Sequence, residues 1–538
     1  DRNYTLVIVN ETSRGRELAQ VLTPGTYSEH RPESTILCSI VSDGTSIGIA
    51  SIDVSTGTCE LRQSLDEDDM NRVLVMLTPR EVIVYADKMD ERYFDAMLLH
   101  RRPLFADMFK ATYQNEYLGR LFPIKTMLTP LEYFDLERLA IGSAAFIGLC
   151  EFLYERNEPS LRFIEKPTIQ DDNDLCVLQN DAVHQLHVIE NAKVPSNHKR
   201  IRSLYDVVNF TSTPMGRRRL KVDITQPISN PDTLSKMYDD VQKVMDKYTF
   251  YESHLKGVPD LERLHRKIEL ETLKPYEMAS LINAYEQILL LMNGTEYNDQ
   301  FMEIFQKLTH TFDIQELTSN GQFFNPGVSE ELDQLTSDHR KARNAVEREC
   351  ERLSKVIGKP DSVTFAYSRG CYQIFTTAAR ASTLAKSQQL TIHKENKTKA
   401  LLTSDKINTI THTLLQMEES LKPMIMEKFT EIVQNMKNDI PVLKEVTKHI
   451  TNVDLLKSRA TVALEYGWTR PIAFRDDEAW VEADQIRHAI IDKLDCEAPY
   501  VPNDVRLNKS HKGILLYGVN GAGKSCYGKA IGLGVILA

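Results

Sequence analysis

The sequence from Gly513 to Ser525 reads Gly-Ile-Leu-Leu-Tyr-Gly-Val-Asn-Gly-Ala-Gly-Lys-Ser. Its second half fits the pattern Gly-x-x-x-x-Gly-Lys-Ser/Thr, in which a strand, a glycine-rich loop and a helix follow one another. The apolar run 514–517 predicts the strand, and the small and aliphatic residues of 524–538 predict the helix. The sequence therefore predicts a phosphate-binding loop that starts at Gly518.

The spacing of this loop has a physical reason. Gly518, Gly521 and Gly523 can adopt backbone conformations closed to other residues, so that successive N–H groups point at a phosphate. The following helix directs its positive end to the same place, Lys524 would neutralise phosphate oxygens, and Ser525 would complete the shell of Mg²⁺. The alternative is a glycine-rich turn that matches by chance. We expect ATP and Mg²⁺ as ligands, bound by Gly518, Val519, Asn520, Gly521, Ala522, Gly523, Lys524 and Ser525.

Hydrolysis needs further groups. The carboxylate that holds the metal and the group that orients water normally come from later strands, and thirteen residues follow Ser525. No catalytic residue is therefore assigned. The chain starts with Asp1 and stops inside the expected helix, so we expect an internal fragment of a longer protein.

Length and composition set further bounds. A chain of 538 residues should hold several domains. Its eight cysteines include no Cys-x-x-Cys pair, which argues against zinc ribbons and a disulfide framework and favours a reducing, intracellular compartment. The nucleus, an organelle and a viral factory fit equally. No apolar run approaches the roughly 18 residues of a membrane span, so no membrane partner is expected.

Charge is distributed unevenly along the chain. The formal net charge is −11, but residues 340–400 hold thirteen lysines and arginines against five acidic residues, a local balance of +8. If the protein contacts DNA, the contact is expected in this region.

The hydrophobic pattern changes along the chain. An apolar, strand-like run at 4–9 comes first, followed by a charged turn and the segment 21–26. Alternation then predicts strands at 36–41, 46–54, 58–62 and 81–85, with a helix at 67–77. From Leu128 onward, three-four spacing predicts helices, with proline at the breaks. The fold class is a multidomain α/β protein that becomes mainly α. Helices are expected at 140–154, 175–189, 204–210, 215–221, 232–251 and 454–468.

Asp53 has two interpretations. A carboxylate on a strand can hold a catalytic metal, as in a nuclease, but that chemistry needs further carboxylates that the sequence does not identify. A solvated Asp, or one that supports a turn, is favoured.

An arm is predicted in the middle of the chain. A heptad-like seam at 328–358 predicts a long exposed helix, alternation on both sides of Arg369 predicts a β-hairpin, and a return seam at 407–436 predicts a second helix, kinked by Pro423 and Pro441. Arg369, Lys394, Lys397 and Lys399 at its basic end are the candidates for binding duplex DNA. The alternative is a coiled coil whose charges only face water.

Tyr500 lies shortly before the glycine loop in sequence. It is a candidate for stacking on an adenine, and a core tyrosine is the alternative.

The order of these parts resembles the MutS proteins of DNA mismatch repair, over nearly the whole chain. The segment Gly257-Val-Pro-Asp-Leu-Glu-Arg263 resembles a run of that family very closely, and the glycine loop follows in the expected place. Further segments that resemble the family are 19–26, 53–57, 211–217, 327–333, 454–471, 487–488 and 500–503.

The resemblance implies a dimer, of identical or paralogous chains, that encircles duplex DNA and is gated by ATP. It implies an RNase H-like connector, a helical lever and core with a long helical-hairpin clamp, and the start of a P-loop ATPase domain. The implied divisions are 1–27 for the end of the mismatch-binding domain, 28–125 for the connector, 126–326 for the core and lever, 327–404 for the clamp arm, 405–466 for the returning lever and 467–538 for the start of the ATPase domain.

The chain also departs from the family pattern. Typical members carry Gly-Pro-Asn-Met-Gly-Gly-Lys-Ser where this chain has Gly-Val-Asn-Gly-Ala-Gly-Lys-Ser, which is similar to a divergent branch of large viruses, some organelles and bacteria, in which a nuclease domain can be fused at the far end. Repair, recombination control and an element-specific role therefore stay open. The family's mismatch wedge would lie before Asp1, so mismatch reading is not assigned.

Two rival functions are a structural-maintenance ATPase, whose loop normally precedes its arm, and a DNA-binding scaffold with an inactive nucleotide site.

Overall fold

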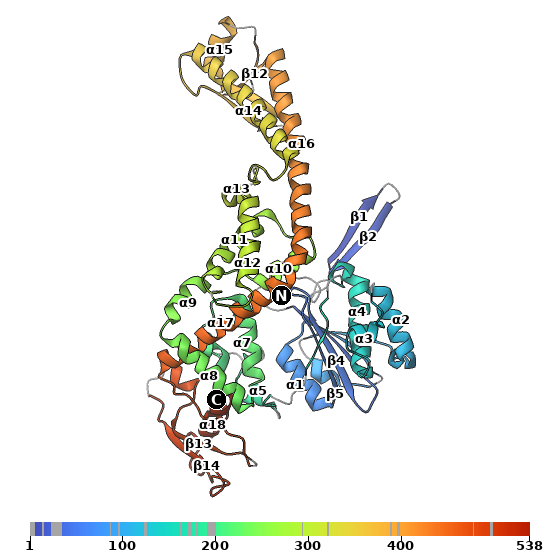
Figure 1. Ribbon diagram of the computed structural model, residues 1–538, viewed down its shortest axis with the longest axis vertical. Coiled ribbons are helices and arrows are strands. Elements are labelled where there is room, and N and C mark those ends of the chain that lie inside the picture. The colour runs from blue at the N-terminus through green and yellow to red at the C-terminus, as the bar shows by residue number, and fades with distance from the viewer. Residues whose placement is uncertain are drawn as a thin grey trace. The chain divides into compact units, whose positions relative to one another are not determined.

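The computed structural model describes residues 6–12, 15–22, 35–86, 88–94, 97–122, 126–161, 164–170, 175–178, 181–190, 201–292, 294–319, 322–368, 370–387, 390–394, 399–476, 478–494 and 499–538. They belong to two compact units (Figure 1). The first unit takes in the chain up to residue 272 together with 286–298 and 440–538, and the second takes in 273–285 and 299–439.

A six-stranded sheet organises the first part of the first unit, in the order β7-β6-β3-β4-β5-β8. Strands β3, β4 and β5 are antiparallel neighbours, β6 and β7 extend the sheet in parallel beyond β3, and β8 pairs in parallel with β5. The bounds are β3 (Ile36–Ser42), β4 (Ile47–Asp53), β5 (Cys59–Leu65), β6 (Glu81–Tyr85), β7 (Leu98–Arg102) and β8 (Thr168–Ile169).

Helices cover both faces of this sheet, so β4 is buried over its whole length. Helix α1 (Glu67–Leu77) packs Met70 and Leu74 on one face, and α4 (Ala140–Leu161) packs on the other (Figure 1). Gly148 lets α4 approach closely, since a Cβ there would lie 2.5 Å from the Tyr85 ring. The strands predicted at 36–41, 46–54, 58–62 and 81–85 and the helix at 67–77 are confirmed.

Shorter elements complete this region. A hairpin precedes the sheet, and residues 6–9 of the predicted strand at 4–9 lie in its first strand, whereas residues 4 and 5 lie outside the described residues. The elements are β1 (Leu6–Thr12), β2 (Gly15–Leu22), η1 (Glu91–Phe94), η2 (Ala106–Phe109), α2 (Ala111–Leu121) and α3 (Pro130–Tyr133).

A helical core forms the next part of the first unit. Its helices are α5 (Ala182–Gln185), α6 (Leu204–Val208), α7 (Pro214–Thr225), α8 (Pro231–Met245), α9 (Tyr248–Leu255), α10 (Leu261–Glu269) and α17 (Ile440–Tyr466). The predicted helices at 140–154, 204–210, 215–221 and 454–468 are confirmed as α4, α6, α7 and part of α17.

Two helix predictions are wrong in extent. Among the described residues of 175–189, only Ala182–Gln185 is helical, because Leu175 pairs with Ile228 instead and the Cys176 N–H donates to the Pro227 carbonyl. The span 232–251 is two helices, because Lys247 leaves the helical conformation between α8 and α9.

The second unit contains the arm. Helices α14 (Glu330–Ile357) and α16 (Asp405–Asn435) pack against each other, and a four-stranded antiparallel sheet in the order β11-β12-β10-β9 lies between them in sequence (Figure 1). Val346, Leu353, Ile374, Leu402 and Leu414 join both helices and the sheet in one apolar cluster. The other bounds are α11 (Pro275–Leu289), shared with the first unit, α12 (Asn298–Thr311), α13 (Ile314–Ser319), β9 (Val363–Ser368), β10 (Cys371–Thr377), α15 (Ala378–Ser387), β11 (Thr391–Lys394), β12 (Lys399–Thr403) and η3 (Met436–Asp439).

The predicted arm helices and hairpin are therefore confirmed, and the two prolines occupy different positions in the returning helix. Pro423 lies inside α16, which stays helical on both sides of it. The break comes at η3, just before Pro441, which occupies the second position of α17, where the missing N–H of proline has no helical partner to lose.

The C-terminal region consists of β13 (Val481–Ile486), η4 (Ile491–Lys493), β14 (Asn503–Leu507) and α18 (Lys524–Leu537), with β13 and β14 antiparallel. The predicted helix after the glycine loop is confirmed as α18. The strand predicted at 514–517 is not formed, and Leu515 and Tyr517 are 86% and 89% exposed. Backbone groups of a strand need a partner strand, and within the described residues none pairs with this segment.

Candidate functional site

The glycine loop has the backbone conformation that its sequence requires. The φ angles of Gly518, Gly521 and Gly523 are 152°, 86° and 86°, values that residues with a Cβ rarely adopt. The Lys524 ammonium folds back over the loop and donates to the Gly518 and Val519 carbonyls at 2.7 and 2.9 Å. Helix α18 begins at Lys524, so its N-terminal N–H groups and the lysine lie at one end of the same loop. This arrangement suits a phosphate group.

Tyr500 lies close to the first turn of α18. Burial raises the pKa of its hydroxyl, Asn503 lowers it through a hydrogen bond, and Cys526 and Tyr527 of α18 add smaller effects. The ring centroid is 6.4 Å from that of His488, and the Tyr500 carbonyl accepts from Arg487. The residue predicted to stack on a base is thus near the helix that carries the lysine.

The arm residues proposed to contact DNA are described in part. The Lys399 ammonium, at the start of β12, lies 3.5 Å from the centroid of the Phe375 ring. Lys394 ends β11, but its side chain, Lys397 and Arg369 lie outside the described residues. The structure therefore places one of the four candidate side chains, against an aromatic ring.

A buried polar junction joins α17 to the start of α7. Asp454 is fully buried, and its carboxylate accepts from the Ser212 N–H at 2.8 Å, the Thr213 N–H at 2.8 Å and the Thr213 hydroxyl at 2.7 Å. Lys457, 2% exposed, lies 3.6 Å from Asp454 and donates to the Phe210 carbonyl and the Ser212 hydroxyl. Gly216 is required here, because a Cβ would lie 2.2 Å from Asp454 Oδ2.

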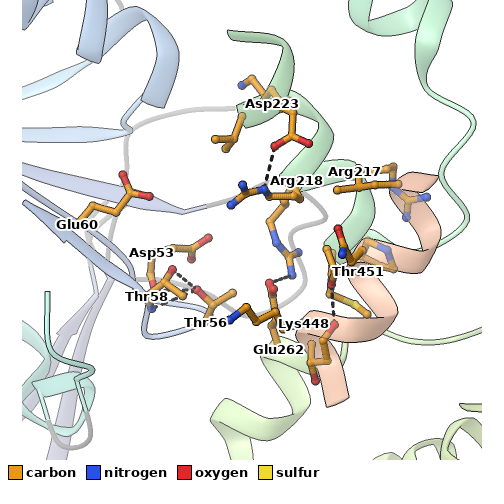
Figure 2. A pocket seen from close by; sticks show the side chains of 18 of the residues that line it. Asp53, Thr56, Thr58, Glu60, Arg217, Arg218, Asp223, Glu262, Lys448 and Thr451 are labelled. Carbon is orange, nitrogen blue, oxygen red and sulfur yellow. Dashed lines mark hydrogen bonds and ion pairs between the residues drawn. The ribbon is translucent and has the colours of Figure 1, made fainter. Parts of the chain in front are cut away.

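A cleft of about 1500 Å³ lies between the sheet and the helices of the first unit. Figure 2 shows Asp53, Thr58 and Glu60 on the sheet side and Arg218 and Lys448 on the helices opposite. Both signs of charge line the cleft.

Of the two roles favoured for Asp53, the structure shows the turn and not solvation, since the residue is only 8% exposed. Its Oδ1 accepts from the Ser55 N–H at 2.9 Å and from the Ser55 hydroxyl at 2.6 Å. Within the described residues, no group of three or more potential ligands could hold a metal ion.

Ion pairs and hydrogen bonds link the sheet to the helices around this cleft. The Arg263 guanidinium donates to the Ser55 hydroxyl at 3.1 Å, and the Lys444 ammonium lies 2.6 Å from Glu165 and 2.8 Å from Glu269. Arg218 holds α7 to α10 through two hydrogen bonds to Asp260 and one to Glu262, all between 2.6 and 2.7 Å. Burial raises the pKa of Glu262, and Arg218 opposes that effect.

His265 of α10 is buried beside this network. Burial lowers its pKa to about 3, the Lys444 charge acts in the same direction, and Asp260 opposes it. Its Nδ1 lies 3.2 Å from the Thr447 hydroxyl of α17. The imidazole is therefore held neutral between two core helices.

Comparison with known protein families decides the identity of this fold. Residues 181–460, more than half of the chain, match the family model described as MutS domain III. The chain belongs to the MutS family. Residues 35–122, which include the first five strands of the six-stranded sheet, match MutS domain II.

Proteins similar to this chain occur in a virus and in bacteria. A putative DNA mismatch repair protein, mutS homolog L359 of Acanthamoeba polyphaga mimivirus, is 24% identical over the whole of this chain and 60% of its own length. DNA mismatch repair protein MutS of Caldanaerobacter subterraneus is 24% identical over 97% of this chain and 62% of its own length, and that of Thermodesulfovibrio yellowstonii is 26% identical over 98% and 63%. The chain thus spans about three-fifths of the length of these MutS relatives.

Sequence patterns alone do not single out the junction of Asp454 and Lys457 as a site. Both belong to a run that reads as an ordinary amphipathic helix, and their partners are more than 240 residues away. The available signal is a pair of charges inside the apolar stripe of that helix.

Among the described helices, none has the length and apolar character needed to cross a bilayer.

Proposed function

We propose that this MutS-family protein is an ATP-dependent DNA-binding protein of the mismatch-repair type, whose arm holds duplex DNA under the control of bound nucleotide. Family membership supports the proposal most strongly, because relatives named DNA mismatch repair proteins match 95% or more of the chain. We take the partner to be a second, identical or paralogous chain around the same duplex.

The nucleotide site would be formed by the loop from Gly518 to Ser525. The positive φ angles of its glycines and the start of α18 at Lys524 support this assignment, because they leave loop N–H groups, a helix N-terminus and an ammonium at one place. Lys524 would exchange its two carbonyl acceptors for phosphate oxygens, Ser525 would hold Mg²⁺, and Tyr500 would stack on the base. Bound ATP with Mg²⁺ would supply the energy of the cycle, through ATPase groups that are not assigned in this chain.

The DNA site would lie on the arm, 327–404, through Arg369, Lys394, Lys397 and Lys399. The excess of positive charge between 340 and 400 supports this. The Lys399 ammonium lies 3.5 Å from the centroid of the Phe375 ring, a contact that would favour one position of the charge on the sheet.

The other proposed divisions are a connector at 28–125, a core and lever at 126–326, a returning lever at 405–466 and the start of the ATPase domain at 467–538. An RNase H-like connector is supported by the strand order, in which three antiparallel strands are extended by two parallel ones on the side of β3.

A conformational change caused by nucleotide binding would reach the lever helices through the apolar side chains that pack against α18. Leu533 and Ile536 of α18 share an apolar cluster with Leu204 of α6, Leu220 of α7 and Leu455 of α17. A shift of α18 on nucleotide binding would therefore reach the helices of the junction directly.

Equilibrium binding of labelled ATP tests the nucleotide half of the proposal. The unmodified protein should bind ATP, and Lys524→Ala should bind it at least tenfold more weakly, because alanine cannot make the charge-assisted hydrogen bonds that an ammonium makes to phosphate oxygens. Equal binding by both proteins would remove the ATP-driven mechanism.

A further inference from the structure

A β-bulge lies beside the phosphate loop. Strands β13 and β14 pair in regular register from Val481 to Ala483, then skip two residues before Ile486 pairs with Asn503. Gln485, inside the bulge, has a φ of 52°, which is unusual for a residue with a side chain. Bulges of this kind often redirect groups next to functional sites, and such a backbone needs an outside interaction to hold it.

Asp504 of β14 supplies that interaction. It lies opposite the bulge, and its Oδ1 accepts from the Gln485 N–H at 2.9 Å. Its backbone carbonyl accepts from the Tyr527 hydroxyl, also at 2.9 Å. One residue therefore joins the bulge in β13 to the first turn of α18, two residues after Ser525.

The two groups that Asp504 binds connect to the two parts of the proposed nucleotide site. Residues 486 and 487 follow the bulge, and the Arg487 guanidinium donates to the Tyr500 carbonyl at 3.3 Å and pairs with Asp492 at 2.9 Å. On the other side, Tyr527 belongs to the helix that begins with Lys524. The bulge is thus connected through Arg487 to Tyr500, the proposed base-stacking residue. Tyr527 belongs to the helix that forms part of the proposed phosphate site.

Helix α18 is also held further along. A Cβ at Gly534 would lie 2.7 Å from Ile486 Cδ1, so α18 packs directly on the residue that ends the bulge. A Cβ at Gly532 would lie 3.0 Å from Leu186 Cδ1 of the core. These contacts fix the far half of α18, and the hydrogen bond from Tyr527 fixes the half that carries the loop.

We propose that Asp504 and Tyr527 are positioning residues of the nucleotide site, which set the spacing between Tyr500 and the phosphate loop so that one ATP molecule reaches both. The inference rests on the proposed function and adds to it residues that touch neither base nor phosphate. Binding of the base and of the phosphates is additive only when the two subsites are held at the right separation.

The test compares ATP with inorganic tripolyphosphate, which occupies the phosphate subsite alone. Tyr527→Phe and Asp504→Ala should each weaken ATP binding about three- to tenfold, the scale of one hydrogen bond, and leave tripolyphosphate binding unchanged. Asp504→Asn should keep the affinity for ATP, because the amide oxygen still accepts from Gln485 and the backbone carbonyl is unchanged. Tyr154→Phe on α4 is the matched control for removal of an exposed tyrosine hydroxyl, and should bind both ligands normally.

Three outcomes would overturn the inference. They are unchanged affinity for ATP in Tyr527→Phe and Asp504→Ala, equal weakening of ATP and tripolyphosphate, and failure of Asp504→Asn to retain ATP binding. Failure of the proposed function is distinguishable, because the unmodified protein would then bind neither ligand, or Lys524→Ala would bind both as well as the unmodified protein.

Discussion

The hydroxyl of Thr213 donates a 2.7 Å hydrogen bond to the Asp454 carboxylate, and this contact joins two residues that are 241 positions apart in the chain. Thr213 is also the cap of α7, accepting from the Gly216 N–H at 3.0 Å. Helix α7 therefore starts where the buried carboxylate of α17 holds its cap. A rotation or translation of α17 would be transmitted to α7 without an intervening flexible segment.

Removing the carboxylate should destabilise the first unit strongly. Asp454→Ala leaves two N–H groups and the Thr213 hydroxyl without their acceptor and the buried Lys457 ammonium without its carboxylate partner, and breaking a buried pair in this way costs about 3–5 kcal/mol. Urea unfolding would measure the destabilisation. Asp454→Asn, which keeps an acceptor for the N–H groups, should be less destabilised, and a cost below about 1 kcal/mol for Asp454→Ala would contradict the role given to this junction.

A methyl group added at Gly216 should be poorly tolerated. Its Cβ would lie 2.2 Å from Asp454 Oδ2, so the buried carboxylate or α7 must move, at a cost of about 1–3 kcal/mol or more. The matched control is Gly119→Ala in α2, where the nearest atom is 3.6 Å away and alanine favours the helix. Thermal unfolding should show Gly216→Ala destabilised and Gly119→Ala neutral or slightly stabilised, and equal effects would argue against a closely packed junction.

His265 predicts a dependence of stability on pH. Its folded pKa of about 3 is below the ordinary 6.5, so between these values the unfolded chain binds a proton that the folded chain does not. The contribution of His265 to the free energy of unfolding is therefore full above pH 6.5. It declines as the pH falls toward 3, by at most about 1.4 kcal/mol per pH unit. Urea unfolding between pH 7 and pH 5 would measure the slope. His265→Gln should flatten it, and an unchanged slope would show that other groups carry the dependence.

The salt dependence of duplex binding locates the DNA contact. Neutralising Lys394, Lys397 and Lys399 together to glutamine should reduce the slope of log K against log salt by roughly 0.9 for each phosphate that is no longer neutralised by a lysine. Lys243, Lys247 and Lys256, in or beside helices α8 and α9, offer a matched triple replacement that should leave the slope unchanged. The same slope in both triple variants would place the DNA contact away from the arm.

Sequence patterns predict the helices and strands that are determined by residues close to one another in the chain. The alternation at 36–41 and 46–54, the capped helix at 67–77 and the two arm helices all depend on residues a few positions apart, and all are present. The conformation of the glycine loop is also predictable, because the positive φ angles of Gly518, Gly521 and Gly523 are a property of that residue type.

Features that depend on distant partners are not predictable in this way. The helix predicted at 175–189 is not formed in full because Leu175 pairs with Ile228, which no local pattern indicates. Asp454 and Lys457 do not stand out in the sequence because their burial depends on the loop at 210–213. The segment 514–517 has the composition of a strand, yet composition supplies no partner for its backbone.

The dissociation of a labelled duplex from the protein, followed after mixing with ATP, tests the coupling between the two proposed sites most directly. Since coupling energies of about 1–3 kcal/mol are typical, ATP should change the dissociation rate about fivefold or more, and Lys524→Ala should dissociate at one rate with and without ATP. An unmodified protein that binds ATP yet releases DNA at the same rate in its presence and absence would contradict control of the arm by nucleotide.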